Sequence, residues 1–182
     1  MHKCEVDVLV DLEIVPLDTL GLNRSSIKKI NFDCGNQSLN DYLKKYAITN
    51  DKNGVAKVFI AVHKESQTIV GYYTSSASVI LTQAIRDELK GNFPTETPAL
   101  LIGRIAVNQS LQGQGIGKKL LRHAFNYAVD ISTKTGVYAV RIDAKDEATK
   151  KYYENSFGFI PFQDSPLSLF LPIATIKKIL EQ

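Results

Sequence analysis

The chain has 182 residues, 44% of them hydrophobic and 23% charged, and carries a formal net charge of +3 at pH 7. This is ordinary globular composition, and we expect one domain over residues 1–182. The sequence shows no apolar run long enough to cross a membrane and no basic-then-apolar leader, which predicts a cytoplasmic protein. Its two cysteines, Cys4 and Cys34, are then expected to be reduced. Three dispersed histidines form no cluster with them, so we expect no metal site.

The first half of the chain shows apolar patterns of two periods. Apolar side chains recur at helical spacing from Leu39 to Ala47, with Asn36 or Ser38 as the cap. Alternation typical of strands marks three segments, which are Glu5–Val15, Ala56–Val62 and Thr68–Ile80.

The second half alternates strand and helix patterns. Ala99–Val107 is a continuous apolar run, as in a central strand. Further strands are expected at Val137–Ile142, Phe159–Phe162 and Leu167–Leu171, and a loop at Gly91–Pro98. Helices are expected at Gln83–Lys90, Ile116–Ile131, Asp146–Asn155 and Pro172–Leu180. The strands outnumber the crossovers that would make them all parallel, which predicts an α/β fold with a mixed sheet.

The junction between the apolar strand and the long helix is rich in glycine. It reads Gln112-Gly113-Gln114-Gly115-Ile116-Gly117. Glycines let the backbone approach a ligand closely, and a helix N-terminus offers N–H donors and partial positive charge. Together they predict an anion cradle, most often for phosphate. The pattern is neither a P-loop, which needs Ser or Thr after Gly-Lys, nor the dinucleotide spacing G-x-G-x-x-G.

The order Gln112-x-x-Gly115-x-Gly117 after an apolar strand resembles the acyl-CoA signature of the GNAT N-acetyltransferases, and Tyr152–Phe159 resembles that family's helix-to-strand segment. The resemblance implies a GNAT fold with a mixed central sheet of about six to seven strands and acetyl-CoA as cosubstrate, without metal. It implies that Tyr153, or its neighbour Tyr152, protonates the CoA sulfur. It further implies that pantetheine pairs with Ile105, Ala106 and Val107, and that the CoA pyrophosphate binds at Gln112, Gly113, Gln114, Gly115, Ile116, Gly117 and Lys118.

A narrower resemblance runs over nearly the whole chain. Asn31–Asn36, Gly71–Thr74 and Pro166–Pro172 are similar to segments of the GNAT-fold toxins of bacterial toxin–antitoxin pairs. This resemblance implies acetylation of aminoacyl-tRNA, a block of translation and a ribbon-helix-helix antitoxin as partner. It also implies a homodimer, and operator DNA bound through the antitoxin complex alone.

The distribution of charge bears on the substrate. Strand Leu100–Val107 has Arg104 as its one ionisable residue and lacks the carboxylate that many GNAT enzymes use as a base. An α-amine, with a pKa near ~8, needs less help to lose a proton than lysine at ~10.4; a base such as Asp143 or a water relay stays open. Two lysine pairs could meet a tRNA backbone, namely Lys44, Lys45, Lys150 and Lys151. The alternatives are acetylation of a small amine or a protein N-terminus, and a non-catalytic acyl-CoA-binding regulator.

Overall fold

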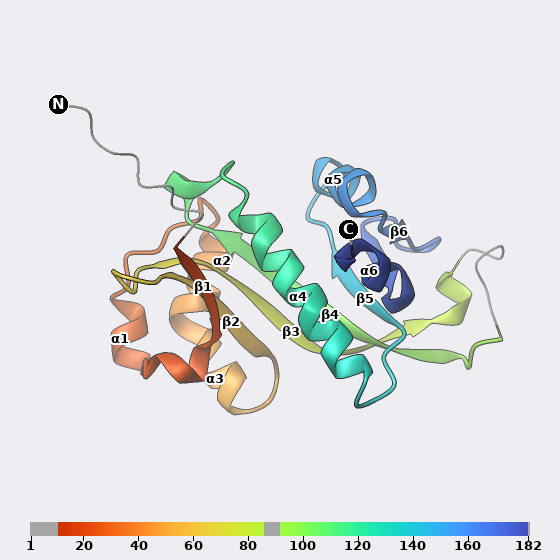
Figure 1. Cartoon of the computed structure of the whole chain (residues 1–182), viewed down its shortest axis with the longest axis horizontal. Helices are drawn as coiled ribbons and strands as arrows, with labels where there is room; N and C mark the ends of the chain where they lie inside the picture. Colours follow the sequence, from red (N-terminus) through yellow and green to blue (C-terminus); the bar gives the residue numbers. More distant parts are fainter. Residues whose placement is uncertain (1–10, 86–91, 182) are drawn as a thin grey trace. The chain divides into compact units, whose positions relative to one another are not determined.

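The computed structural model describes residues 11–85 and 92–181 (Figure 1). Seven strands form one mixed sheet in the order β1-β2-β3-β4-β5-β7-β6, which confirms the predicted mixed α/β fold. The strands are β1 (Leu12–Pro16), β2 (Lys57–His63), β3 (Ile69–Leu81), β4 (Glu96–Val107), β5 (Ala139–Asp143), β6 (Ile160–Pro161) and β7 (Ser168–Pro172). The helices are η1 (Leu17–Leu20), α1 (Arg24–Lys28), α2 (Gln37–Asp41), η2 (Tyr42–Tyr46), α3 (Ala47–Lys52), η3 (Thr82–Ala84), η5 (Gln109–Leu111), α4 (Ile116–Ser132), α5 (Glu147–Phe157) and α6 (Ile173–Leu180).

The chain forms two compact units, and neither is one continuous segment. The first contains residues up to Thr74 together with Arg104–His123, and the second contains Ser75–Gly103 and the residues from Ala124 onward. β3, β4 and α4 therefore each contribute residues to both units. The single domain expected over residues 1–182 stays a prediction.

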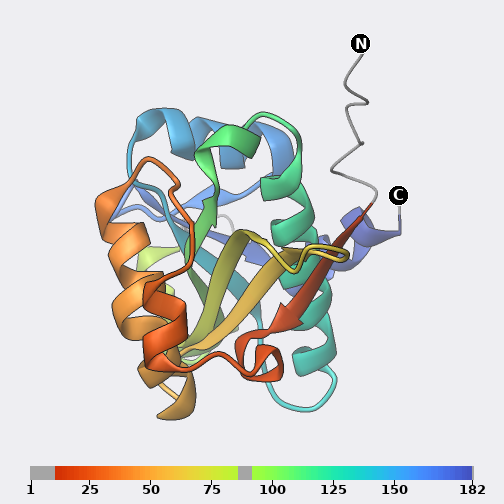
Figure 2. The ribbon, with the colours of Figure 1, turned by 90° about the vertical axis from the view of Figure 1, so that its left-hand side faces the viewer.

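In the first unit, helices cover both faces of the strands (Figure 2). The segment from α1 to α3 lies on one face, where Leu43 and Phe32 are buried in a cluster with Tyr72 of β3. The start of α4 lies on the other face, where the ring of His123 packs 5.4 Å from that of Phe59 on β2. The two apolar faces explain why β2 and the start of β3 are buried almost throughout.

The helix predicted from Leu39 to Ala47 is part of a longer run, Gln37–Lys52, with a wide turn inside it. Asn36 is the cap, since its side chain accepts a hydrogen bond from the Leu39 N–H at 3.2 Å. From Tyr42 to Tyr46 the run is a π-helix, closed by a hydrogen bond from the Ala47 N–H to the Tyr42 carbonyl. Nothing in the apolar spacing predicted this turn.

Gly71 of β3 marks a close approach of backbone and helix in the first unit. A Cβ at this position would lie 2.8 Å from the Ala106 carbonyl oxygen of β4 and 3.1 Å from Leu120 Cδ1 of α4. The carbonyl belongs to a strand backbone and cannot turn aside, so the position requires glycine.

We therefore expect Gly71→Ala to lower the free energy of unfolding by about 1–3 kcal/mol, the usual cost of forcing extra volume into a packed site. Chemical denaturation monitored by circular dichroism measures the change. Gly136→Ala is the matched control, because a Cβ there meets nothing within 4 Å. Equal stability of the two variants would contradict the conclusion that close packing requires glycine at position 71.

The second unit is built around β5. β5 runs parallel to β4 from Ala99↔Ala139 to Ile102↔Ile142, and antiparallel to β7. β4 continues past this register to Val107. Asp146 caps α5 as predicted, accepting a hydrogen bond from the Thr149 N–H at 2.7 Å, and the helix ends at Gly158 with a left-handed φ of 75°.

Several predicted boundaries differ from the structure. The loop predicted over Gly91–Pro98 is wrong for its last residues, because β4 begins at Glu96. Pro98 lies just before the β4–β5 register begins at Ala99, so this register does not need its missing N–H, and its carbonyl accepts the Tyr138 N–H at 2.9 Å. The short helix predicted at Gln83–Lys90 is a 3-10 turn at Thr82–Ala84, and residues 86–90 lie outside the described residues, as do residues 5–10 of the first predicted strand.

Candidate functional site

The glycine-rich junction has the geometry of an anion cradle. Gly113 and Gly115 have φ values of 80° and 81°, in the left-handed region that side chains rarely adopt. A Cβ on Gly113 would meet nothing within 4 Å, so space lies open above the backbone. The 17-residue helix α4 begins directly after Gly115. The N–H groups of its first turn have no partner inside the helix and can meet an anion.

The end of β4 presents two different edges. Asn108 donates its N–H to the Val70 carbonyl of β3 at 2.8 Å, and the Ala106 carbonyl faces Gly71 of β3. Because backbone polar groups alternate between the edges of a strand, those of Ile105 and Val107 point to the opposite edge. On that edge, β4 continues to Val107, past Ile102, the last residue in the β4–β5 register.

The side chain of Gln112 holds the cradle to the strand. Its Nε2 donates hydrogen bonds to the Val107 carbonyl and to the Cys34 carbonyl, each at 3.0 Å. The first residue of the motif thus joins the end of β4 to a loop 78 residues away in sequence. The motif spacing predicted a backbone role for Gln112 but not this contact.

The Asp33–Asn36 loop is braced from within. The amide of Asn40, buried in α2, donates to Asp33 Oδ1 at 2.7 Å and accepts the Cys34 N–H at 2.9 Å. Asp33 Oδ1 also accepts the Gly35 N–H, and these bonds hold the pKa of Asp33 below its usual value. The Asp33 carbonyl accepts the N–H of Gln109 at 2.7 Å. The loop that carried part of the toxin resemblance is therefore a support for the cradle.

These features fit the diphosphate of a nucleotide such as CoA. Two left-handed glycines, open space above Gly113 and a helix N-terminus supply what a pyrophosphate needs. Lys118, in the first turn of α4, is exposed and adds positive charge. A cradle with side chains in place of these glycines would be strained and filled.

Tyr153 lies in the second unit, on α5. Its ring packs 5.7 Å from that of Phe159, and burial, with a smaller contribution from Tyr152, raises the pKa of Tyr153 to about 12. Tyr152 is 42% exposed on the same helix. Burial raises the pKa of both phenols, so both are protonated at neutral pH, and Tyr153 is the less exposed of the two.

The carboxylate considered as a base, Asp143, is engaged with neighbouring side chains. Its Oδ1 accepts hydrogen bonds from Ser168 Oγ at 2.6 Å and from Arg141 Nη2 at 3.3 Å. Both contacts use the same oxygen. The carboxylate of Asp143 is thus engaged with side chains of β5 and β7.

The four lysines proposed for tRNA differ in their surroundings. Lys45 pairs with Asp41 at 3.0 Å, and Lys150 pairs with Glu147 at 3.4 Å. Within residues 11–85 and 92–181, Lys44 and Lys151 have no ion pair, so their charge is the more available to a ligand. Lys44 belongs to the first unit and Lys151 to the second.

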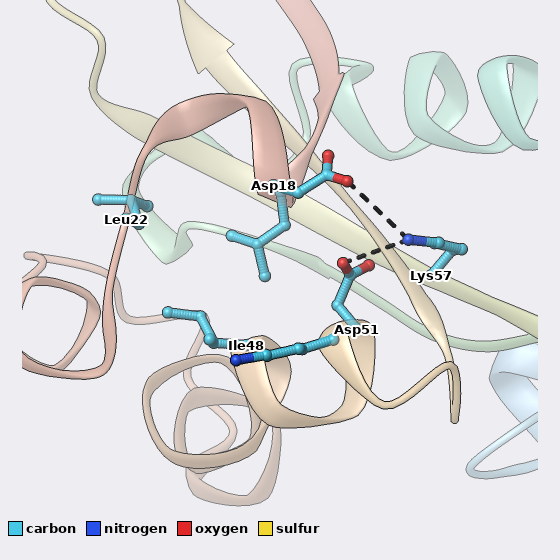
Figure 3. A pocket seen from close by; sticks show the side chains of 7 residues that line it. Asp18, Leu22, Ile48, Asp51 and Lys57 are labelled. Carbon is cyan, nitrogen blue, oxygen red and sulfur yellow. Dashed lines mark hydrogen bonds and ion pairs between the residues drawn. The ribbon is translucent and has the colours of Figure 1, made fainter.

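A pocket of about 410 Å³ in the first unit has different chemistry (Figure 3). Lys57 Nζ lies 3.4 Å from Asp51 and 4.0 Å from Asp18, beside apolar walls that include Leu22 and Ile48. The buried Asp51 also accepts the Val58 N–H at 2.9 Å. Three of the four charged residues that line this pocket pair with one another, which favours a structural ion-pair site.

In the described part of the chain, no helix is both long and apolar enough to span a bilayer. No group of three or more His, Cys, Asp or Glu residues is placed to hold a metal ion in residues 11–85 and 92–181.

Comparison with known proteins gives relatives over most of the chain. A tRNA-acetylating toxin of Mycobacterium tuberculosis is 29% identical over 140 residues, which are 77% of this chain and 82% of that protein. The structure of AtaT complexed with acetyl-methionyl-tRNAfMet is 28% identical, with a TM-score of 0.81, and covers 93% of this chain and 99% of its own. A second AtaT structure is of a tyrosine-to-phenylalanine mutant bound to the C-terminus of the antitoxin AtaR and to acetyl-CoA. It is 26% identical, with a TM-score of 0.74, and the match covers 94% of this chain and 99% of the AtaT chain. The model of the acetyltransferase (GNAT) family matches residues 25–159, and the chain belongs to this family.

Proposed function

We propose that this protein uses acetyl-CoA to acetylate the α-amino group of aminoacyl-tRNA, and that it acts in the cytoplasm as a toxin that blocks translation. The observation that carries the proposal is the pair of left-handed glycines, Gly113 and Gly115, held between β4 and α4. One relative that matches more than nine-tenths of the chain, AtaT, was solved with an acetylated aminoacyl-tRNA and, as a mutant, with acetyl-CoA.

The residues have separate roles in the proposed reaction. Bound acetyl-CoA supplies the acetyl thioester. Backbone amides of Gln112, Gly113, Gln114, Gly115, Ile116, Gly117 and Lys118 hold its pyrophosphate, and the strand end Ile105-Ala106-Val107 pairs with pantetheine, chiefly through Ile105 and Val107. Tyr153 gives its proton to the leaving sulfur as the C–N bond forms and the C–S bond breaks, and the proton that the attacking amine loses returns through water to the phenolate. The strand lacks a carboxylate near its end, which suits an α-amine that is already partly neutral.

The proposed partners follow from the relatives. A ribbon-helix-helix antitoxin would neutralise the protein, as the AtaR C-terminus binds AtaT, and operator DNA would be bound through that complex. A homodimer is the proposed assembly. Expression alone should arrest growth, and coexpression with the antitoxin should restore it.

The substrate is tested with charged tRNA, free amino acids and lysine peptides. We expect acetylation of charged tRNA at the highest kcat/KM and a marked loss of rate with added salt, because phosphate contacts release counterions. Lys44→Glu and Lys151→Glu should each raise KM for charged tRNA and lower the salt slope by about 1 or more, without changing KM for acetyl-CoA.

Lys134→Glu is the control for these charge reversals. Lys134 pairs with Asp130 at 2.6 Å near the end of α4, away from the motif in sequence. Equal rates on free amino acids and charged tRNA, without a salt effect, would refute the tRNA substrate and favour a small amine. Binding of acetyl-CoA with no acetylation of any amine would favour the alternative that the protein is a non-catalytic acyl-CoA-binding regulator.

A further inference from the structure

Arg104 is a cation held on an aromatic surface beside the end of β4. It shares a strand face with Ala106, two residues further on, and is exposed. Its guanidinium carbon lies 4.0 Å from the centroid of the Tyr42 ring. The Tyr42 ring stacks on that of Tyr72, with centroids 6.1 Å apart and planes inclined by 16°. Both tyrosines are buried, so the guanidinium rests on a fixed aromatic base.

The guanidinium lacks a carboxylate partner in the described ranges 11–85 and 92–181, whereas Arg141 pairs with Asp143. Stacking occupies one face of the guanidinium and leaves the N–H groups at its edge available. Two N–H groups on such an edge can donate parallel hydrogen bonds to two oxygens of one phosphate. The arrangement of Arg104 is therefore that of an anion receptor.

The ring under the guanidinium belongs to the π-helical turn. Tyr42 is the first residue of that turn. π-Turns are rare, and they occur frequently at functional sites. β4 thus supplies the guanidinium, and the π-helical turn supplies the ring under it.

Taking the proposed aminoacyl-tRNA reaction as its basis, we propose that Arg104 binds the phosphate on the 5′ oxygen of the terminal adenosine of the substrate. Three residues of extended strand separate Arg104 from Val107, a span of roughly 10 Å. About eight covalent bonds separate the α-amine from that phosphorus, and at the reach per bond of an extended chain they span up to roughly 9 Å. A guanidinium at Arg104 can therefore hold the phosphate while the amine lies near the end of the strand.

Two small substrates test the proposal directly. One is an aminoacyl ester of adenosine 5′-monophosphate and the other is the same ester of adenosine. We expect the wild-type protein to show a KM roughly ten- to hundred-fold lower for the phosphorylated ester, the range for a hydrogen bond between charged groups. Arg104→Gln should remove this preference by raising KM for the phosphorylated ester alone, with kcat and KM for acetyl-CoA unchanged. Arg104→Lys, which keeps the charge but loses the planar fork, should keep part of it.

Arg24→Gln is the matched control, because it removes the same charge from an exposed arginine at the start of α1. It should keep the full preference. On charged tRNA, Arg104→Gln should lower the salt slope by about 1. A wild-type protein that acetylates both esters with equal KM, or an Arg104→Gln variant that keeps the preference, overturns the role of Arg104 alone. A wild-type protein that acetylates neither ester nor charged tRNA overturns the proposed substrate and the role of Arg104 with it.

Discussion

Replacing Gly115 by glutamate is expected to abolish the stabilisation that acetyl-CoA gives to the wild-type protein. A ligand that binds the folded state alone stabilises it by mass action, by about 2.7 kcal/mol at a hundred times its Kd. Gly115 has a φ of 81° and directly precedes α4. A glutamate there would be strained, and its carboxylate would repel the pyrophosphate from the helix N-terminus. Thermal unfolding with and without acetyl-CoA measures the loss.

Gly54→Glu is the control that distinguishes loss of the anion cradle from the effect of backbone strain alone. Gly54 also has a positive φ, 69°, and a Cβ there meets nothing within 4 Å. Glutamate at this position adds the same charge and a similar backbone strain, but in the turn before β2. The variant should therefore unfold at a lower temperature without ligand, while acetyl-CoA should still raise its unfolding temperature as in the wild type. If Gly115→Glu still binds acetyl-CoA normally, the pyrophosphate lies elsewhere.

Tyr153→Phe is expected to lower kcat by about 10²- to 10⁴-fold, the usual contribution of a general acid. The change keeps the ring that packs on Phe159 and removes the proton that burial holds on the phenol, whose pKa is about 12. A phenol this weakly acidic gives up its proton only as charge develops on the leaving sulfur, whose own acid has a pKa near ~8.5. Acetyl-CoA affinity should change little.

Tyr152→Phe, next in sequence and more exposed, is the control and should keep nearly full turnover. Steady-state rates with charged tRNA and calorimetric binding of acetyl-CoA measure both variants. Full activity of Tyr153→Phe combined with loss in Tyr152→Phe would assign the proton donor to Tyr152.

The sequence predicted features whose cause is local. The strand ending at Val107, the glycine junction and the helix from Ile116 follow from apolar runs, glycine spacing and helical periodicity, and α4 differs from its prediction by one residue, at its end. Asn36, one of the two candidate caps, and Asp146 could be predicted because a capping side chain bonds to backbone three residues away.

Features that depend on distant contacts could not be predicted in this way. The Gln112 side chain acts through Cys34, and Arg104 through Tyr42, so neither role is visible in spacing. α1 was missed because five residues are too few to show a period, although Asn23 and Ser26 form a capping box that marks its start.

The discontinuity of the first unit has a consequence for how the protein is made. Residues 11–74 are synthesised well before Arg104–His123, the strand end and helix start with which they form one compact unit. Domains fold as their segments emerge from the ribosome, and pairings between distant segments form late. The Asp33–Asn36 loop cannot meet Gln112 until the intervening residues exist. A nascent chain that stops before residue 112 therefore lacks the glycine-rich junction, and an interrupted round of synthesis releases a fragment without the proposed activity.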